Sequence, residues 1–99
     1  STLESAVVRY CKTWGVLTYK FVSPSNRGVP DRIFIGAHGD VAFLELKAPG
    51  KEPTPLQLHN IEKFKVRGVA IDCADNLATC QNFIHTNVIN GPKARKSER

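Results

Sequence analysis

The stretch GVPDRIFIGAHGDVAFLELK, residues 28–47, predicts a β-hairpin. Two runs rich in β-branched and aromatic residues flank Gly39, which suits the left-handed position of a three-residue hairpin loop. With that loop, Asp31 lies directly opposite Glu45. Glu45 and Lys47 project from one face, because side chains alternate along a strand. The hairpin therefore brings two acids and a lysine to one of its ends, and its apolar faces predict a central place in a sheet.

Two opposed carboxylates repel each other in an apolar hairpin unless a cation lies between them. Hard divalent cations prefer carboxylate oxygens, and a lysine nearby can stabilise a reacting anion. Each residue alone has an ordinary alternative: Asp31 can cap the turn after Pro30, Glu45 can be a solvated strand end, and Lys47 can be a surface lysine. The clustering of all three residues on one face of a central hairpin favours a metal-dependent catalytic site.

Length and composition indicate one globular domain of 99 residues, of which 41% are hydrophobic. No apolar run is long enough to span a membrane, and the N-terminus lacks a signal-peptide pattern, so we expect a cytoplasmic protein without a membrane partner. The three cysteines are odd in number and lack CxxC spacing, which predicts reduced thiols rather than disulfides or a zinc site.

The net charge of +5 is concentrated in the last nine residues, which contain four basic residues and one acidic residue. A glycine and a proline open this segment, and it has almost no apolar side chains. We therefore expect a folded domain at residues 1–90 and a basic, disordered tail at residues 91–99. Such a tail can bind phosphates or can simply increase solubility.

Periodicity predicts the remaining elements. The expected order is a helix over residues 3–14, a strand over 16–22, the hairpin, a helix from Thr54 to Gly68 with Leu58, Ile61 and Phe64 on its apolar stripe, a strand over 69–73, and a last helix beginning at 75 or 76. An antiparallel meander followed by a crossover helix and a parallel strand gives an α/β fold with a mixed central sheet and helices on both faces.

This α-β-β-β-α-β(-α) order, with Pro30-Asp31 and Glu45-Leu46-Lys47, resembles the restriction-endonuclease-like core of the PD-(D/E)xK nuclease superfamily. Within it the chain is most similar to the VRR-NUC family, the virus-type replication-repair nucleases. That family has an acid on the first helix, a Gly-x-Pro-Asp turn, a Glu-x-Lys strand and a glutamine on the next helix. Here these elements are Glu4, residues 28–31, residues 45–47 and Gln57. Four elements in this order are far more specific than the bare PD…ExK pattern.

The resemblance implies an enzyme, a Mg²⁺-dependent DNA endonuclease, in which Mn²⁺ can replace Mg²⁺. The implied metal ligands are Glu4, Asp31, Glu45 and the backbone carbonyl of Leu46. The implied catalytic residues are Asp31, Glu45, Lys47 and Gln57.

Glu4 and Gln57 each have a structural alternative. A carboxylate such as Glu4 near a helix N-terminus is favourable to the helix dipole without any metal. Gln57 stands three residues after Thr54, which is the spacing of a capping box. Gln57 also shares a helical face with Ile61, so it can point toward the sheet and serve both purposes.

The substrate is implied to be DNA. Short stand-alone members of the family resemble Holliday-junction resolvases that work as homodimers, in phages and bacteria, which implies branched DNA and roles in repair and recombination. Flap or exonuclease activity, restriction-type cleavage, and a non-catalytic DNA-binding module are the alternatives. Five basic residues either grip DNA phosphates or form ordinary solvated surface: Arg27, Lys51, Lys63, Lys65 and Arg67. Arg32 is a weaker candidate, because it lies on the strand face opposite Asp31.

Overall fold

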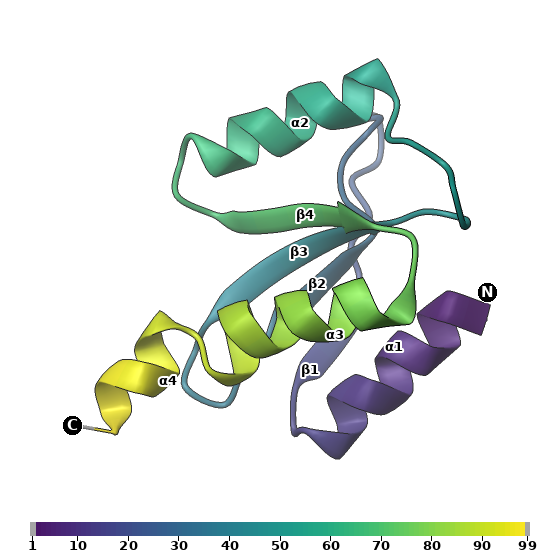
Figure 1. Cartoon of the computed structure of the whole chain (residues 1–99). Coiled ribbons are helices and arrows are strands. Elements are labelled where there is room, and N and C mark those ends of the chain that lie inside the picture. The colour runs from purple at the N-terminus through teal and green to yellow at the C-terminus, as the bar shows by residue number, and fades with distance from the viewer. Residues whose placement is uncertain (1, 99) are drawn as a thin grey trace.

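The computed structural model describes residues 2–98 and has the predicted order of elements, followed by one further helix (Figure 1). The elements are α1 (Thr2–Thr13), β1 (Leu17–Lys20), β2 (Arg32–Ile35), β3 (Val41–Leu46), α2 (Pro55–Lys65), β4 (Ala70–Ala74), α3 (Leu77–Ile84) with a π-helical turn at His85–Ile89, and α4 (Pro92–Ser97). The sheet order is β1-β2-β3-β4. β1 to β3 form an antiparallel meander, and β4 is parallel to β3 after the crossover through α2. The predicted mixed α/β fold is confirmed.

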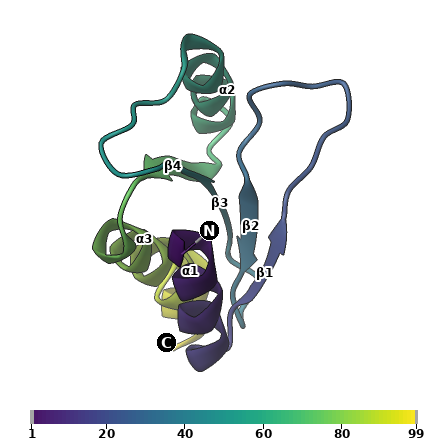
Figure 2. The same cartoon turned by 90° about the vertical axis from the view of Figure 1, so that its right-hand side faces the viewer.

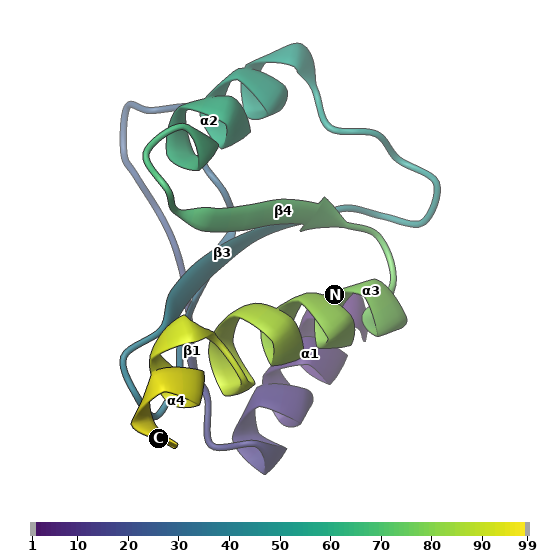
Figure 3. The same cartoon turned by 60° about the vertical axis from the view of Figure 1, so that its left-hand side comes forward.

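α1 and α3 cover one face of the sheet, and α2 lies on the other side, near β4 (Figures 2 and 3). The main core is on the α1 and α3 side, where Phe34 and Leu44 pack with Val7 of α1 and Ile84 of α3, all 0% exposed. On the α2 side, the ring of Phe43 packs edge-on against that of Phe64, with centroids 5.2 Å apart. The sheet thus has one face that is fully covered and one that is covered only in part.

The uncovered part of the α2-side face includes β1 and the beginning of β3. Leu17 and Tyr19 of β1 are 54% and 55% exposed, and Val41 of β3 is 42% exposed. Leu17 pairs with Ile35, which in turn pairs with Val41, so these side chains form a continuous apolar row across the strands. No helix among residues 2–98 is long and apolar enough to cross a membrane.

The hairpin has the register predicted from its loop. Ile33 pairs with Phe43, the Gly36 amide donates to the Asp40 carbonyl at 2.8 Å, and Gly39 has a φ of +92°. Continuing this register by one residue places Asp31 opposite Glu45. The hairpin supplies the two central strands of the sheet, as its apolar faces predicted.

The C-terminal segment is helical, so the expectation that residues 91–99 are disordered is wrong for Pro92–Ser97. The carboxylate of Asp40, at the tip of the hairpin, accepts hydrogen bonds from the backbone amides of Lys93 and Ala94, both at 3.0 Å. Ala94 is buried, at 4% exposure. The composition of the tail does not reveal its order, because the residue that caps this helix lies more than fifty positions earlier in the chain.

Candidate active site

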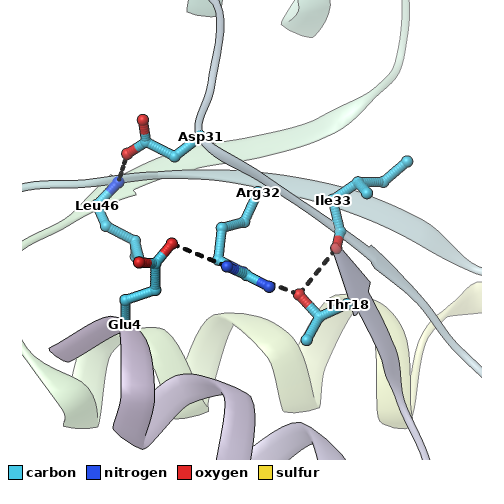
Figure 4. A network of polar contacts seen from close by, with 6 residues as sticks. All are labelled: Glu4, Thr18, Asp31, Arg32, Ile33 and Leu46. Carbon is cyan, nitrogen blue, oxygen red and sulfur yellow. Dashed lines mark hydrogen bonds and ion pairs between the residues drawn. The ribbon is translucent and has the colours of Figure 1, made fainter. Parts of the chain in front are cut away.

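The two predicted acids meet where the central strands end. Asp31 immediately precedes β2, and Glu45 is the penultimate residue of β3. Glu45 is 5% exposed, and its carboxyl group is close enough to that of Asp31 to share a hydrogen bond. One oxygen of Asp31, Oδ2, accepts a hydrogen bond from the Leu46 amide at 2.7 Å (Figure 4). The neighbouring strand therefore fixes Asp31 in its position opposite Glu45.

The surroundings of Glu45 disfavour its ionised form. Burial first, and then the hydrogen bond and the charge of Asp31, raise the pKa of Glu45 to about 8, while the charge of Lys47 acts in the opposite direction. A carboxyl group with this pKa is largely protonated at neutral pH. Two such hard oxygen donors fit a divalent cation, which could take the place of that proton.

Glu4 approaches the same region from α1, but it pairs with an arginine rather than with the other acids. Arg32, only 6% exposed, donates from Nη1 to Glu4 Oε2 at 2.8 Å, and from Nε to Thr18 Oγ1 at 3.2 Å (Figure 4). The bond from Arg32 lowers the pKa of Glu4. Within residues 2–98, no group of three or more His, Cys, Asp or Glu side chains is arranged to hold a metal.

Glu4 and Asp31 nevertheless face one pocket of about 340 Å³. We call it the acid pocket; its lining residues are Glu4, Lys20, Phe21, Val22, Asp31 and Leu46. Charges of both signs line it, since Lys20 contributes to lowering the pKa of Glu4. Glu4 therefore shares a pocket with Asp31 but is oriented by Arg32.

The structure brings Lys47 and Gln57 together. The Lys47 ammonium donates to Gln57 Oε1 at 3.1 Å. The same oxygen accepts from the Thr54 amide at 2.9 Å, and the Gln57 amide donates to Thr54 Oγ1 at 3.2 Å. Gln57 therefore completes the capping box of α2 and also contacts the lysine of the Glu-x-Lys strand.

The predicted DNA-contacting residues lie outside the acid pocket. Arg27 and Lys63 line a second depression, between the loop of residues 21–31 and α2, which we call the loop–α2 pocket. Lys51 is exposed in the loop before α2, and Lys65 and Arg67 are exposed at the C-terminal end of α2.

A buried amide joins the loop to α2. Asn60, 7% exposed, donates from Nδ2 to the carbonyl oxygens of Arg27 and Leu56, both at 3.1 Å. Gly28 has a φ of +76°, and a Cβ atom there would lie 2.8 Å from Leu56 Cγ and 2.9 Å from Asn60 Nδ2. This close packing fixes the turn that carries Asp31.

Sequence reasoning missed the roles of Lys20, Arg32 and Asn60. A signal for Arg32 exists, because a charged residue interrupts an otherwise apolar central strand and must be paired if it is buried. Lys20 and Asn60 give no comparable signal, since an exposed lysine at a strand end and a polar residue within a helix are both ordinary.

Comparisons with known proteins agree with this geometry. No family model matches the sequence. The chain is 47% identical over 75 residues to "Putative nuclease p44" of Acyrthosiphon pisum secondary endosymbiont phage 1, covering 76% of this chain and 81% of that protein.

Two solved structures have the same fold. A "VRR_NUC domain" matches with a TM-score of 0.78 and 24% identity, over 85% of this chain and 91% of that one. A "VRR_NUC domain protein" matches with a TM-score of 0.70 and 18% identity, over 87% and 84%. With its Gly-x-Pro-Asp turn and Glu-x-Lys strand brought together, the chain belongs to the VRR-NUC family of nucleases.

Proposed function

We propose that this nuclease is a divalent-metal-dependent DNA endonuclease that cuts branched DNA in the manner of a Holliday-junction resolvase. The observation that carries the proposal is the pair of the buried Glu45 and the half-buried Asp31, with Lys47 directly after the end of β3. Two carboxyl groups that face each other with little access to solvent favour a bound divalent cation between them.

The residues that would hold Mg²⁺ or Mn²⁺ are Asp31, Glu45 and the backbone carbonyl of Leu46, with Glu4 extending the set from α1. When bound, such a cation lowers the pKa of a water molecule and offsets the negative charge on the phosphate oxygens. The chain's own contribution is to keep the donors in place. Leu46 holds Asp31 through its amide, and Arg32 holds Glu4 across the acid pocket.

Lys47 supplies a fixed positive charge beside the reacting phosphate or the attacking water. A charge that is already in position requires no reorganisation when the transition state forms. The Oε1 atom of Gln57 restrains the Lys47 ammonium, and Gln57 is itself restrained by the N-cap of α2. Gln57 is thus proposed to position Lys47, and its amide group can also orient water.

The basic residues around α2 are proposed to contact DNA phosphates that flank the cleaved bond. Arg27 and Lys63 border one depression, and Lys51, Lys65 and Arg67 are exposed on either side of it along the chain. Contacts of this kind make binding strongly dependent on salt and independent of base sequence.

The active assembly is proposed to be a homodimer acting in the cytoplasm of a bacterial or phage-infected cell. A four-way junction must be cut on two strands, and one domain of this size carries one site. Two-fold pairing places two sites on symmetry-related strands. The exposed apolar row of Leu17, Tyr19 and Val41 supports pairing, because large apolar patches on a small protein commonly mark interfaces.

One experiment tests this proposal directly. Labelled four-way junction, flap and linear duplex are incubated in parallel with the protein and Mg²⁺, with EDTA and Asp31→Asn as controls, and sedimentation gives the oligomeric state. We expect paired cuts in the junction by a dimer. Equal cleavage of linear and branched DNA by a monomer would contradict the resolvase proposal and leave the nuclease site intact. Cleavage confined to free ends would indicate an exonuclease.

A further inference from the structure

The loop of residues 21–31 separates the two depressions near the acids. The acid pocket lies on its α1 side and contains Glu4 and Asp31, whereas the loop–α2 pocket lies on its other side and contains Arg27 and Lys63. Figure 2 shows this loop extending beyond β1 and β2 alongside α2. The basic residues that the sequence suggested therefore do not line the pocket in which the acids lie.

Among residues 2–98, three cationic side chains lie near the acids, and two of them already make hydrogen bonds to neighbouring side chains. Arg32 is buried and bonds Glu4 and Thr18, and the Lys47 ammonium bonds Gln57. Lys20 is different, because it is exposed and its ammonium makes no hydrogen bond or ion pair with another residue in the described range 2–98. Lys20 ends β1 and pairs with Arg32 across the ladder, so its backbone is fixed at the edge of the acid pocket.

The neighbours of Lys20 suit a nucleic-acid strand better than a small free anion. Phe21 and Val22 line the same pocket, and Val22 is 73% exposed. A DNA strand alternates charged phosphates with less polar sugars. A lysine beside apolar side chains can therefore contact both parts of the strand. A polyanion that approaches two or more carboxylates also needs a cation at the entrance, since the acids repel it at long range.

We propose that Lys20 is a phosphate contact of the acid pocket, and that it grips the DNA strand on the side of the acids opposite Arg27 and Lys63. This inference rests on the proposed function, in that the substrate is taken to be DNA. Lys20 and the α2-side residues would then hold successive parts of the backbone on either side of the loop. Such a contact affects binding of substrate and transition state alike, so it should change KM more than kcat.

The test measures binding of a labelled four-way junction in EDTA, by fluorescence anisotropy, over a range of salt concentrations. The variants are Lys20→Ala, Lys20→Arg and Lys12→Ala, a control that removes the same charge from the exposed last turn of α1. We expect Lys20→Ala to lower affinity about fivefold at low salt and to reduce the slope of log K against log salt by about 0.9. Lys20→Arg should restore both values, and Lys12→Ala should change neither.

Two results would overturn the inference: an unchanged salt slope in a Lys20→Ala protein that melts like the wild type, or an equal loss in Lys12→Ala. Cleavage with Mg²⁺ separates this inference from the proposed function. If the wild type cleaves and Lys20→Ala has an unchanged KM, the Lys20 contact is wrong and the nuclease proposal stands. If the wild type binds DNA but does not cleave it, the nuclease proposal fails, and the salt slope still decides the role of Lys20.

Discussion

Strand β3 has a buried carboxyl group near each of its ends. The two groups are equally hidden from solvent but have different neighbours. Asp40 precedes the strand and Glu45 is near its end, and each is 5% exposed. Asp40 accepts two backbone amides of α4, both at 3.0 Å. Glu45 instead faces a second acid, Asp31, and its pKa is raised to about 8. Asp40 is thus bound by hydrogen-bond donors at one end of the strand, whereas Glu45 faces another carboxyl group at the other end.

We interpret this difference as that between a structural carboxylate, Asp40, and one with a proposed role in the active site, Glu45. Amide donors compensate for the loss of water around Asp40, so its burial stabilises the fold. The charge of Lys47 only partly offsets the burial of Glu45 and its repulsion by Asp31, and a site that keeps such repulsion is a candidate for ligand binding or catalysis. The comparison can be tested, because substitutions at the two ends should move stability and activity in different directions.

The largest effect is expected from removing either acid of the pair. Asp31→Ala and Glu45→Ala should each lower Mg²⁺-dependent junction cleavage by at least roughly a thousandfold, because the main donors for the cation are lost. Both proteins should remain folded, as judged by thermal unfolding in EDTA. Near-normal cleavage by either variant under limiting Mg²⁺ would contradict the proposed role of Asp31 and Glu45 in binding the cation.

Lys47→Ala should give the next largest loss, a fall of about a hundredfold in the single-turnover cleavage rate. Junction affinity in EDTA should remain nearly unchanged, because the proposed work of the Lys47 charge is in the transition state. A loss of affinity with an unaltered rate would instead make Lys47 a substrate-binding residue.

Gln57→Glu adds a third carboxylate to the Glu45 end without disturbing the helix. A glutamate can still accept from the Thr54 amide and from Lys47, so the cap of α2 is retained. We expect cleavage to fall about tenfold, since an amide donor is lost and negative charge is added near the phosphate. Full activity in this variant would show that Gln57 serves only as a capping residue.

Asp40→Ala should affect stability rather than chemistry. The amides of Lys93 and Ala94 lose their acceptor, and the free energy of unfolding should fall by about 1–3 kcal/mol. Urea unfolding measures this loss, and cleavage at a temperature where the variant is folded should match the wild type. Loss of cleavage in the folded variant would mean that the two ends of β3 are coupled.

The pH dependence of stability is the effect most specific for Glu45. Its native pKa lies above its unfolded value, so the native state holds a proton that the unfolded chain releases. In EDTA, the contribution of Glu45 should therefore make stability fall as pH rises from about 4.5 to about 8. Glu45→Gln should flatten this slope in urea unfolding measured across that range, and an unchanged slope would contradict the raised pKa.

Local patterns predicted most of the fold and part of the site. The register of the hairpin and the capping box at Thr54 follow from residues close together in the chain, so they could be read from the sequence. Leu58 shows the limit of such patterns, because helical spacing placed it on an apolar stripe and it is 52% exposed. Ile61 is buried and Phe64 packs on Phe43 as the stripe predicted, but Gln57 and Asn60 point inward as well and have polar partners.

Contacts between distant residues could not be predicted in this way. Glu4 and Arg32 are 28 positions apart, and Ala94 and Asp40 are 54 apart. Each of these pairs depends on how whole helices and strands pack together. The sequence around either residue of a pair does not indicate which residue it contacts. The same limitation applies to Lys20, whose importance arises only from the pocket that it borders.

The close packing around Gly28 has a consequence for engineering this nuclease. A side chain at this position would collide with α2, whereas residues 24–27 of the same loop are exposed. Insertions and randomised libraries should therefore be tolerated in the first half of the loop and rejected at its second half. A designer who wishes to alter the proposed DNA preference can lengthen the loop around Ser25 and leave the turn at residues 28–31 untouched, so that Asp31, a proposed metal ligand, keeps its position.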